Sequence, residues 1–141
     1  MPPSAFPLPA LGDIVYCRFP ESPGKPGPKP RPALVTGLAE FEDGTKAVVV
    51  AYGTSQRTTQ LLAGEFVIAP GDTEAYRAAG LSFATKFDLR RRVSLPYTDE
   101  WFRVPPIPFF GQTPKLGILH PTLMRRAQAA FVAASGPLPK T

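Results

Sequence analysis

Apolar residues gather in short runs along the first half of the chain, separated by polar or proline-rich stretches. Residues 13–19, 33–38 and 46–52 mix β-branched, aromatic and other apolar side chains in a pattern typical of strands. The Asp-Gly pair at residues 43–44 predicts a hairpin between the second and third runs. Because the run 46–52 is almost continuously apolar, we expect it to be a central strand.

Three further runs in the second half of the chain have strand patterns. They cover residues 65–69, 82–89 and 91–95, and they bring the expected total to five or six strands. Short strands in this number, followed by one terminal helix, favour a single mostly β (α+β) domain over residues 1–141. We expect this domain to be a small barrel.

Two helices are expected in addition to the strands. Asp72 is suited to cap a short helix that runs to Ala79 and stops at Gly80. Pro121 is suited to the first turn of a terminal helix over residues 123–134. This terminal helix has an apolar stripe at helical spacing, made of Leu123, Ala127, Ala130, Phe131 and Ala134.

Prolines mark segments that belong to neither kind of element, because proline breaks helix interiors and donates no ladder hydrogen bond. Residues 1–11 form a proline-rich lead-in, and residues 103–117 form an irregular proline-rich segment before the terminal helix. The densest stretch, 20–32, holds six prolines and two glycines together with Lys25, Lys29 and Arg31. It predicts a long basic surface loop, and such loops within a domain are commonly functional.

Composition narrows the possible function classes. Sixteen Lys and Arg against 11 Asp and Glu give a net charge of +5, which suits a phosphate-bearing partner but is also common without one. Glycine-rich nucleotide loops and the common hydrolase motifs do not occur, so no cofactor is expected. A single cysteine, Cys17, and a single histidine, His120, exclude an internal disulfide and a Cys/His metal cluster. We expect Cys17 to be a buried apolar residue and His120 to be exposed or to cap the terminal helix.

The N-terminus, Met-Pro-Pro, has neither the basic start nor the apolar run of a signal peptide. No apolar stretch approaches the length needed to span a bilayer. These features predict a cytoplasmic protein with no membrane partner.

Three short motifs occur in an order and spacing that carry more information than any one of them. Gly12-Asp13-Ile14-Val15 opens the first expected strand, Arg31-Pro32-Ala33-Leu34-Val35 leads the second, and Thr54 follows the third within the stretch 50–56. This arrangement resembles the MazF/PemK family of bacterial toxin endoribonucleases. The resemblance implies a small SH3-like β-barrel with a short helix and a C-terminal helix, usually dimeric, that cleaves single-stranded RNA without a metal or cofactor.

By this resemblance Arg31 is the catalytic arginine and Thr54 is its partner at the scissile phosphate. The residues expected to bind the substrate are Arg18, Lys29, Ser55 and Gln56. A guanidinium fork suits this chemistry because it can bind two phosphoryl oxygens while charge builds on them. The resemblance further implies a homodimer that belongs to a type II toxin–antitoxin system and binds a cognate antitoxin protein. The loop Pro26-Gly27-Pro28-Lys29-Pro30 departs from the Glu-Gln that many members have there.

Other interpretations of these residues remain open. Without the resemblance, Arg31 is a solvated cation, Thr54 is a strand-end residue that bonds its own backbone, and Arg18 is an outward-facing strand charge. The run Arg90–Arg92 is either a solvated turn or a track for RNA phosphates. The aromatic residues that either stack bases, cover the barrel or dock a partner, with packing favoured, are Trp101, Phe102, Phe109 and Phe110.

Two other functions are also compatible with the sequence. The same barrel can serve as a non-catalytic module that binds nucleic acid or protein, because one fold hosts many functions. The proline-rich segment 20–32 can alternatively be the extended ligand of a partner protein.

Overall fold

Six antiparallel strands form one sheet in the order β4-β5-β3-β2-β1-β6. The computed structural model describes residues 6–135, so residues 1–5 of the expected lead-in lie outside the described residues. The strands are β1 (Asp13–Cys17), β2 (Arg31–Glu40), β3 (Lys46–Thr54), β4 (Glu65–Ile68), β5 (Thr85–Pro96) and β6 (Lys115–Ile118).

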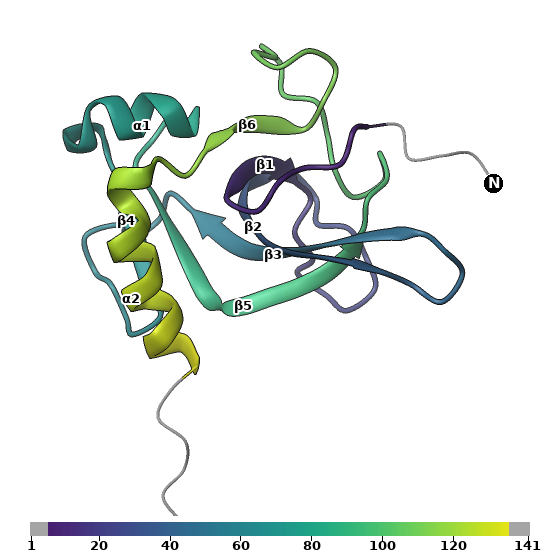
Figure 1. Ribbon diagram of the computed structural model, residues 1–141, viewed down its shortest axis with the longest axis horizontal. Helices are drawn as coiled ribbons and strands as arrows, with labels where there is room; N and C mark the ends of the chain where they lie inside the picture. The colour runs from purple at the N-terminus through teal and green to yellow at the C-terminus, as the bar shows by residue number, and fades with distance from the viewer. Residues whose placement is uncertain (1–5, 136–141) are drawn as a thin grey trace, which may run out of the picture.

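Helices α1 (Glu74–Ala79) and α2 (Met124–Ser135) lie at the end of the molecule near β4, and the β2–β3 hairpin projects from the other end (Figure 1). The predicted mostly β fold with a C-terminal helix is confirmed. Between residues 6 and 135 no ladder joins the edge strands β4 and β6.

Side chains that alternate along the central strands enter two separate cores. Ile14, Leu34 and Ala51 pack in a cluster to which both helices contribute, for example through Ala79 and Ala127. The adjacent residues of the same strands join a second cluster, made largely of Val15, Cys17, Ala33, Val35, Val50, Leu95, Trp101 and Phe102. The sheet is therefore buried on both faces, which explains why β3 is almost continuously apolar, as expected of a central strand.

The strands expected on either side of residue 90 are one bent strand, so the prediction of two separate strands was wrong. Ala51 of β3 pairs with Arg92 of β5, whereas the next residue, Tyr52, pairs with Asp88. The extra β5 residues form a bulge, and a bulge bends its strand without ending the pairing. Figure 1 shows the resulting sharp bend in β5.

The three arginines at this bend are exposed, as a solvated run would be, but they lie within β5 and two of them also stack on aromatic rings. The guanidinium carbon of Arg91 lies 4.1 Å from the ring centroid of Tyr52. That of Arg92 lies 5.0 Å from the ring centroid of Phe131 on α2. Phe131 is 43% exposed, whereas Leu123, Ala127 and Ala130 of the same apolar stripe are buried.

The expectation of an irregular segment over 103–117 was wrong at its end, where β6 pairs with β1. This strand has four residues, includes Gly117 and follows Pro114, so it has no readable alternation. Trp101 and Phe102, just before the segment, are 7% and 0% exposed, which confirms the packing interpretation for these two residues.

Cys17 and His120 both have the structural roles expected from the sequence. Cys17 is fully buried, and burial raises the pKa of its thiol. Nδ1 of His120 accepts a hydrogen bond from the Thr122 amide at 3.2 Å, at the start of the 3₁₀ turn Pro121–Leu123 that leads into α2. Pro121 occupies the first turn, as predicted.

The predicted cap of α1 was wrong, although its predicted end at Gly80 is confirmed by a left-handed φ of 70°. Asp72 belongs to a 3₁₀ turn, Pro70–Asp72, that precedes the helix. Its carboxylate accepts the amide proton of Ala69 at 2.8 Å. Both oxygens also accept hydrogen bonds of 3.1 Å from Arg126 of α2. Asp72 therefore connects the turn before α1 to the terminal helix.

The Asp72–Arg126 pair gives the fold a pH dependence. The Arg126 hydrogen bonds lower the pKa of Asp72 below its ordinary value of 3.8. The stabilisation is therefore complete above the unfolded pKa and is lost as the pH falls through the lower folded pKa. We expect Asp72→Asn to reduce the free energy of unfolding at pH 7 by about 1 kcal/mol, because both partners are partly exposed. Urea unfolding at pH 7 and pH 2.5 measures this difference, which should be smaller at the lower pH. A loss of equal size in Asp99→Asn, an exposed carboxylate, would contradict this account.

Candidate functional site

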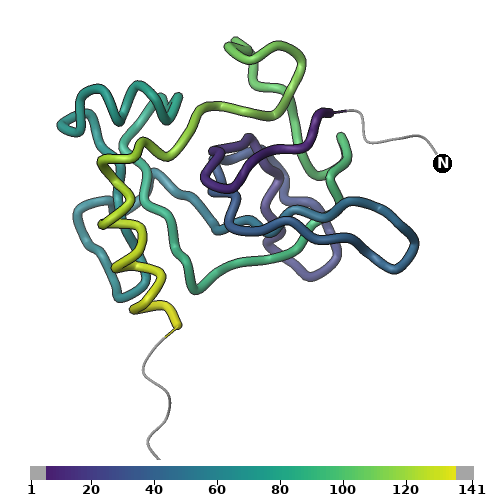
Figure 2. Tube along the Cα trace, viewed as in Figure 1, coloured from purple at the N-terminus to yellow at the C-terminus, as the bar shows by residue number. Residues whose placement is uncertain are grey.

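A groove of about 740 Å³ is lined mainly by four segments of the chain, with one residue each from β1, β5 and β6. The end of the basic loop and the start of β2 contribute residues 29–32, and the end of β3 contributes residues 53–55. Residues 76–83, from α1 and the turn after it, contribute six positions, and the connection between β5 and β6 contributes four from 105–109. Figure 2 shows α1 and this connection projecting on the same side of the sheet.

Strand pairing brings Arg31 and Thr54 together. Arg31 is the first residue of β2, and Thr54 is the last residue of β3. The two strands are antiparallel, with Ala33 opposite Tyr52. The β2–β3 ladder ends at this pair, and Arg31 and Thr54 each lie two residues beyond it. Both residues line the groove, as the sequence led us to expect.

Gly53 allows the two strands to approach closely at this point. A Cβ at Gly53 would collide with the carbonyl oxygen of Pro32 and would lie 2.9 Å from the ring of Phe87. Any larger residue would therefore push β3 away from β2. The close approach of β3 to Pro32, the residue after Arg31, consequently depends on the absence of a side chain at Gly53.

The charged residues of the groove are all basic. They are Lys29, Arg31 and Arg77, and no acidic side chain is among the described residues that line the groove. Within residues 6–135 none of the three has a hydrogen-bonding or ion-pair partner for its side chain. Unpaired cations in a concave site attract an anionic ligand.

Thr54 has the local contact of a strand-end threonine and also lines the groove. Its Oγ1 accepts a hydrogen bond of 3.1 Å from the amide of Gln56, which is the local backbone contact of a strand-end threonine. The hydroxyl proton remains free to donate into the groove. Ser55 also lines the groove, whereas Gln56 is exposed outside its lining.

Arg18 lies outside the groove lining and holds the basic loop. Its Nε donates to the carbonyl oxygen of Gly27 at 2.9 Å, and the Gly27 amide donates back to the Arg18 carbonyl at 3.0 Å. A further bond of 3.3 Å runs from its Nη1 to the carbonyl of Glu100. These contacts fix the loop two residues before Lys29, so Arg18 orients a groove residue from outside.

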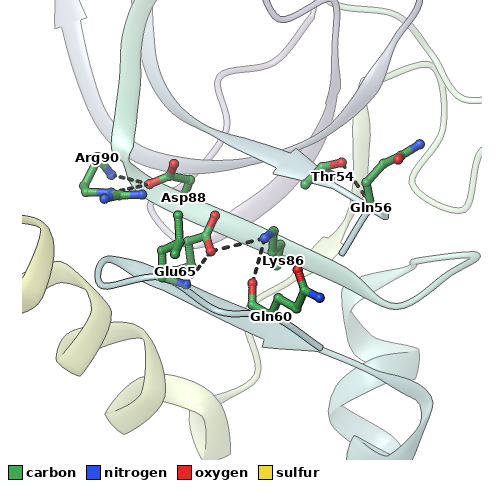
Figure 3. A network of polar contacts seen from close by, with 8 residues as sticks. Thr54, Gln56, Gln60, Glu65, Lys86, Asp88 and Arg90 are labelled. Atoms are coloured by element: carbon green, nitrogen blue, oxygen red, sulfur yellow. Dashed lines mark hydrogen bonds and ion pairs between the residues drawn. The ribbon is translucent and has the colours of Figure 1, made fainter. Parts of the chain in front are cut away.

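A buried ion pair lies next to Thr54 on the neighbouring strand. Lys86 of β5 is the ladder partner of Thr54. Its Nζ lies 3.2 Å from Glu65 Oε1 and donates to the Gln60 carbonyl at 3.0 Å (Figure 3). Only 9% and 7% of the two charged side chains are exposed. Glu65 also accepts the Leu62 amide at 2.7 Å, so the pair anchors the loop that follows Thr54.

The described residues contain no group of three or more His, Cys, Asp and Glu side chains that could hold a metal ion. His120, which caps the 3₁₀ turn before α2, is not among the residues that line the groove. No helix within residues 6–135 is long and apolar enough to cross a membrane.

Comparison with known proteins identifies the family. The family model described as "PemK-like, MazF-like toxin of type II toxin-antitoxin system" matches residues 10–97, which is more than half of the chain. The chain belongs to this toxin family. The matched residues run from just before β1 to just after β5, so they include Arg31, Thr54 and the basic loop. No curated protein sequence matches the chain.

Two solved structures of endoribonucleases from Mycobacterial species are similar to this member of the toxin family. One, in complex with its cognate antitoxin, is 19% identical with a TM-score of 0.56, and the match covers 95% of this chain and 100% of that one. The other is 18% identical with a TM-score of 0.55, covering 96% of this chain and 100% of that one. At these identities the likeness concerns the fold.

Several groove residues of this toxin-family chain were not predicted from its sequence. Arg77 and Tyr76 come from α1, and Phe83 comes from the turn that follows it. These residues lie far from Arg31 in the sequence, and no periodicity or motif marks them. Only the folding of α1 against the sheet brings them to the groove.

Substitution of Lys86 tests whether its ion pair with Glu65 supports the groove. Lys86→Met leaves the Glu65 carboxylate buried without a counter-charge, so we expect a loss of about 3–5 kcal/mol in the free energy of unfolding. Urea denaturation measures it. Lys46→Met removes the exposed Lys46–Glu40 pair and should cost less than about 1 kcal/mol. Equal losses in the two variants would contradict the anchoring role of Lys86.

Proposed function

We propose that the chain is an endoribonuclease toxin that cleaves single-stranded RNA without a metal ion. The observation that carries the proposal is that Arg31 and Thr54, each two residues beyond the end of the β2–β3 ladder, line one groove whose charged residues are all basic. Membership of the PemK/MazF toxin family and the fold shared with two endoribonucleases support it.

The reaction is an intramolecular displacement at phosphorus. The 2′-oxygen of the RNA attacks the adjacent phosphorus and loses its proton to solvent. The bond from phosphorus to the 5′-oxygen breaks, and that oxygen takes up a proton. The products are a 2′,3′-cyclic phosphate on one fragment and a 5′-hydroxyl on the other. During this step negative charge grows on the non-bridging phosphoryl oxygens.

Arg31 and Thr54 act on this growing charge. The guanidinium donates two parallel hydrogen bonds to phosphoryl oxygens, and the Thr54 hydroxyl donates a further one. Donors already aimed at the developing charge stabilise the transition state more than the ground state. Arg31 has no protein partner among the described residues, so no ion pair must break when the phosphate binds. Ser55 and Lys29 bind the adjacent parts of the RNA backbone.

The remaining expectations about assembly are part of this proposal. The curved sheet is an SH3-like barrel within a single domain, and the protein acts as a cytoplasmic homodimer. A cognate antitoxin controls it, in line with the antitoxin complex of one similar endoribonuclease. An antitoxin that covers the groove would present acidic groups to Lys29, Arg31 and Arg77.

Cleavage of a mixed single-stranded RNA in EDTA tests the proposed activity. Arg31→Ala should lower kcat/KM by about 10²–10³-fold, because it removes donors to the transition-state charge. Thr54→Val should lower it by about 10–100-fold through loss of one hydrogen bond to a charged group. Mass spectrometry of the fragments should find 2′,3′-cyclic phosphate ends.

Lys25→Ala is the matched control, because Lys25 is an exposed cation of the same loop that does not line the groove. It should leave kcat/KM unchanged. RNA that stays intact at high concentrations of wild-type protein, or an Arg31→Ala variant as active as wild type, would refute the proposed function.

A further inference from the structure

We propose that Phe83 and Phe109 form a base-stacking edge of the groove, on which unpaired bases of the RNA lie while its phosphates contact the cations. This inference rests on the proposed function and assigns a place in the groove to the bases. Neither residue belongs to the proposed catalytic pair or to the residues proposed to bind the RNA backbone.

Both rings line the groove and are almost fully solvated. Phe83 is 71% exposed and Phe109 is 77% exposed, and Ile107 beside them is 74% exposed. The same chain buries aromatic residues where they serve packing, since Trp101 and Phe102 are 7% and 0% exposed. Large apolar side chains gathered at one concave site indicate a ligand with apolar surface.

The backbone segments that carry both rings are restrained before a ligand arrives. The Thr85 hydroxyl donates to the Phe83 carbonyl at 2.9 Å and fixes the turn after α1. Phe109 follows Pro105, Pro106 and Pro108, whose rings restrict the backbone, and Pro105 is buried. Prior ordering of this kind lowers the entropy lost on binding.

The charges of the groove favour RNA as the occupant. A single strand presents phosphates along its backbone and flat π-faces at its bases, and proteins bind it by combining a basic groove with aromatic platforms. Here three cations and two exposed phenylalanines line one groove that has no acidic side chain among its described residues. Phe109 also lies beyond residues 10–97, so it belongs to a segment outside the family match.

Phe110 provides a matched control next to Phe109 in the sequence. It is 45% exposed and does not line the groove. Lys115 Nζ lies 4.7 Å from its ring centroid, so this ring already has a partner. Phe110→Ala therefore removes the same side chain from the same connection without removing a groove residue.

Binding of a 2′-O-methyl RNA oligonucleotide, which lacks the attacking hydroxyl, separates base stacking from cleavage. Phe83→Ala and Phe109→Ala should each weaken binding by about 5- to 100-fold in fluorescence anisotropy. Phe110→Ala should bind like wild type. The salt dependence should distinguish the two kinds of contact: Arg77→Ala should reduce the slope of log K against log salt by about 0.7, and the phenylalanine variants should leave it unchanged.

Abasic nucleotides in the oligonucleotide identify what the rings contact. Removing the stacked base should weaken wild-type binding and have little further effect in the matching phenylalanine variant. Thermal unfolding midpoints equal to wild type should accompany these changes, because both side chains are exposed.

If the wild type cleaves RNA and Arg31→Ala does not, but both phenylalanine variants bind like wild type, the stacking edge is refuted and the proposed function stands. An edge that serves a protein partner would give this same overturning result. Failure of the proposed function would instead appear as absence of cleavage by the wild type.

Discussion

The close antiparallel approach of β2 and β3 is the constraint on which the candidate site depends. It brings the first residue of one strand, Arg31, and the last residue of the other, Thr54, just beyond the final β2–β3 pair, where both line one groove. The approach requires glycine at position 53, because a side chain there would meet the backbone of Pro32. Two cores, one on each face of the sheet, hold these strands in place. The buried Lys86 beside Thr54 then fixes the loop that leaves the ladder. A guanidinium without a protein partner and a hydroxyl proton free to donate consequently face one groove.

Local patterns predicted much of the scaffold. The first three strands, their Asp-Gly hairpin and the terminal helix depend on neighbouring residues, so periodicity and turn chemistry were sufficient to find them. The burial of Cys17 followed from its place in a strand pattern. That Arg31 and Thr54 share one groove was expected from the resemblance to the toxin family, and strand register supplies the physical reason. Their roles in catalysis remain a prediction.

Features that depend on distant partners were not predicted. β6 is recognised only through its pairing with β1, and the bend of β5 only through its continued pairing with β3. Asp72 instead binds Arg126, which lies on a helix far along the chain, and the local sequence does not reveal this partner. Arg77 and Phe83 enter the groove only when α1 packs against the sheet. Tertiary contacts decide each of these cases, and a single sequence does not display them.

A double-mutant cycle on Arg31→Ala and Thr54→Val, measured as kcat/KM for single-stranded RNA cleavage in EDTA, tests the central claim most directly. If the two residues act on the same phosphate, their effects are coupled, as for residues that act as a unit. The account predicts that the fold-loss in kcat/KM of the double variant is at least about tenfold smaller than the product of the two single fold-losses. Losses that multiply without coupling would contradict the claim that the register of β2 and β3 builds one catalytic pair.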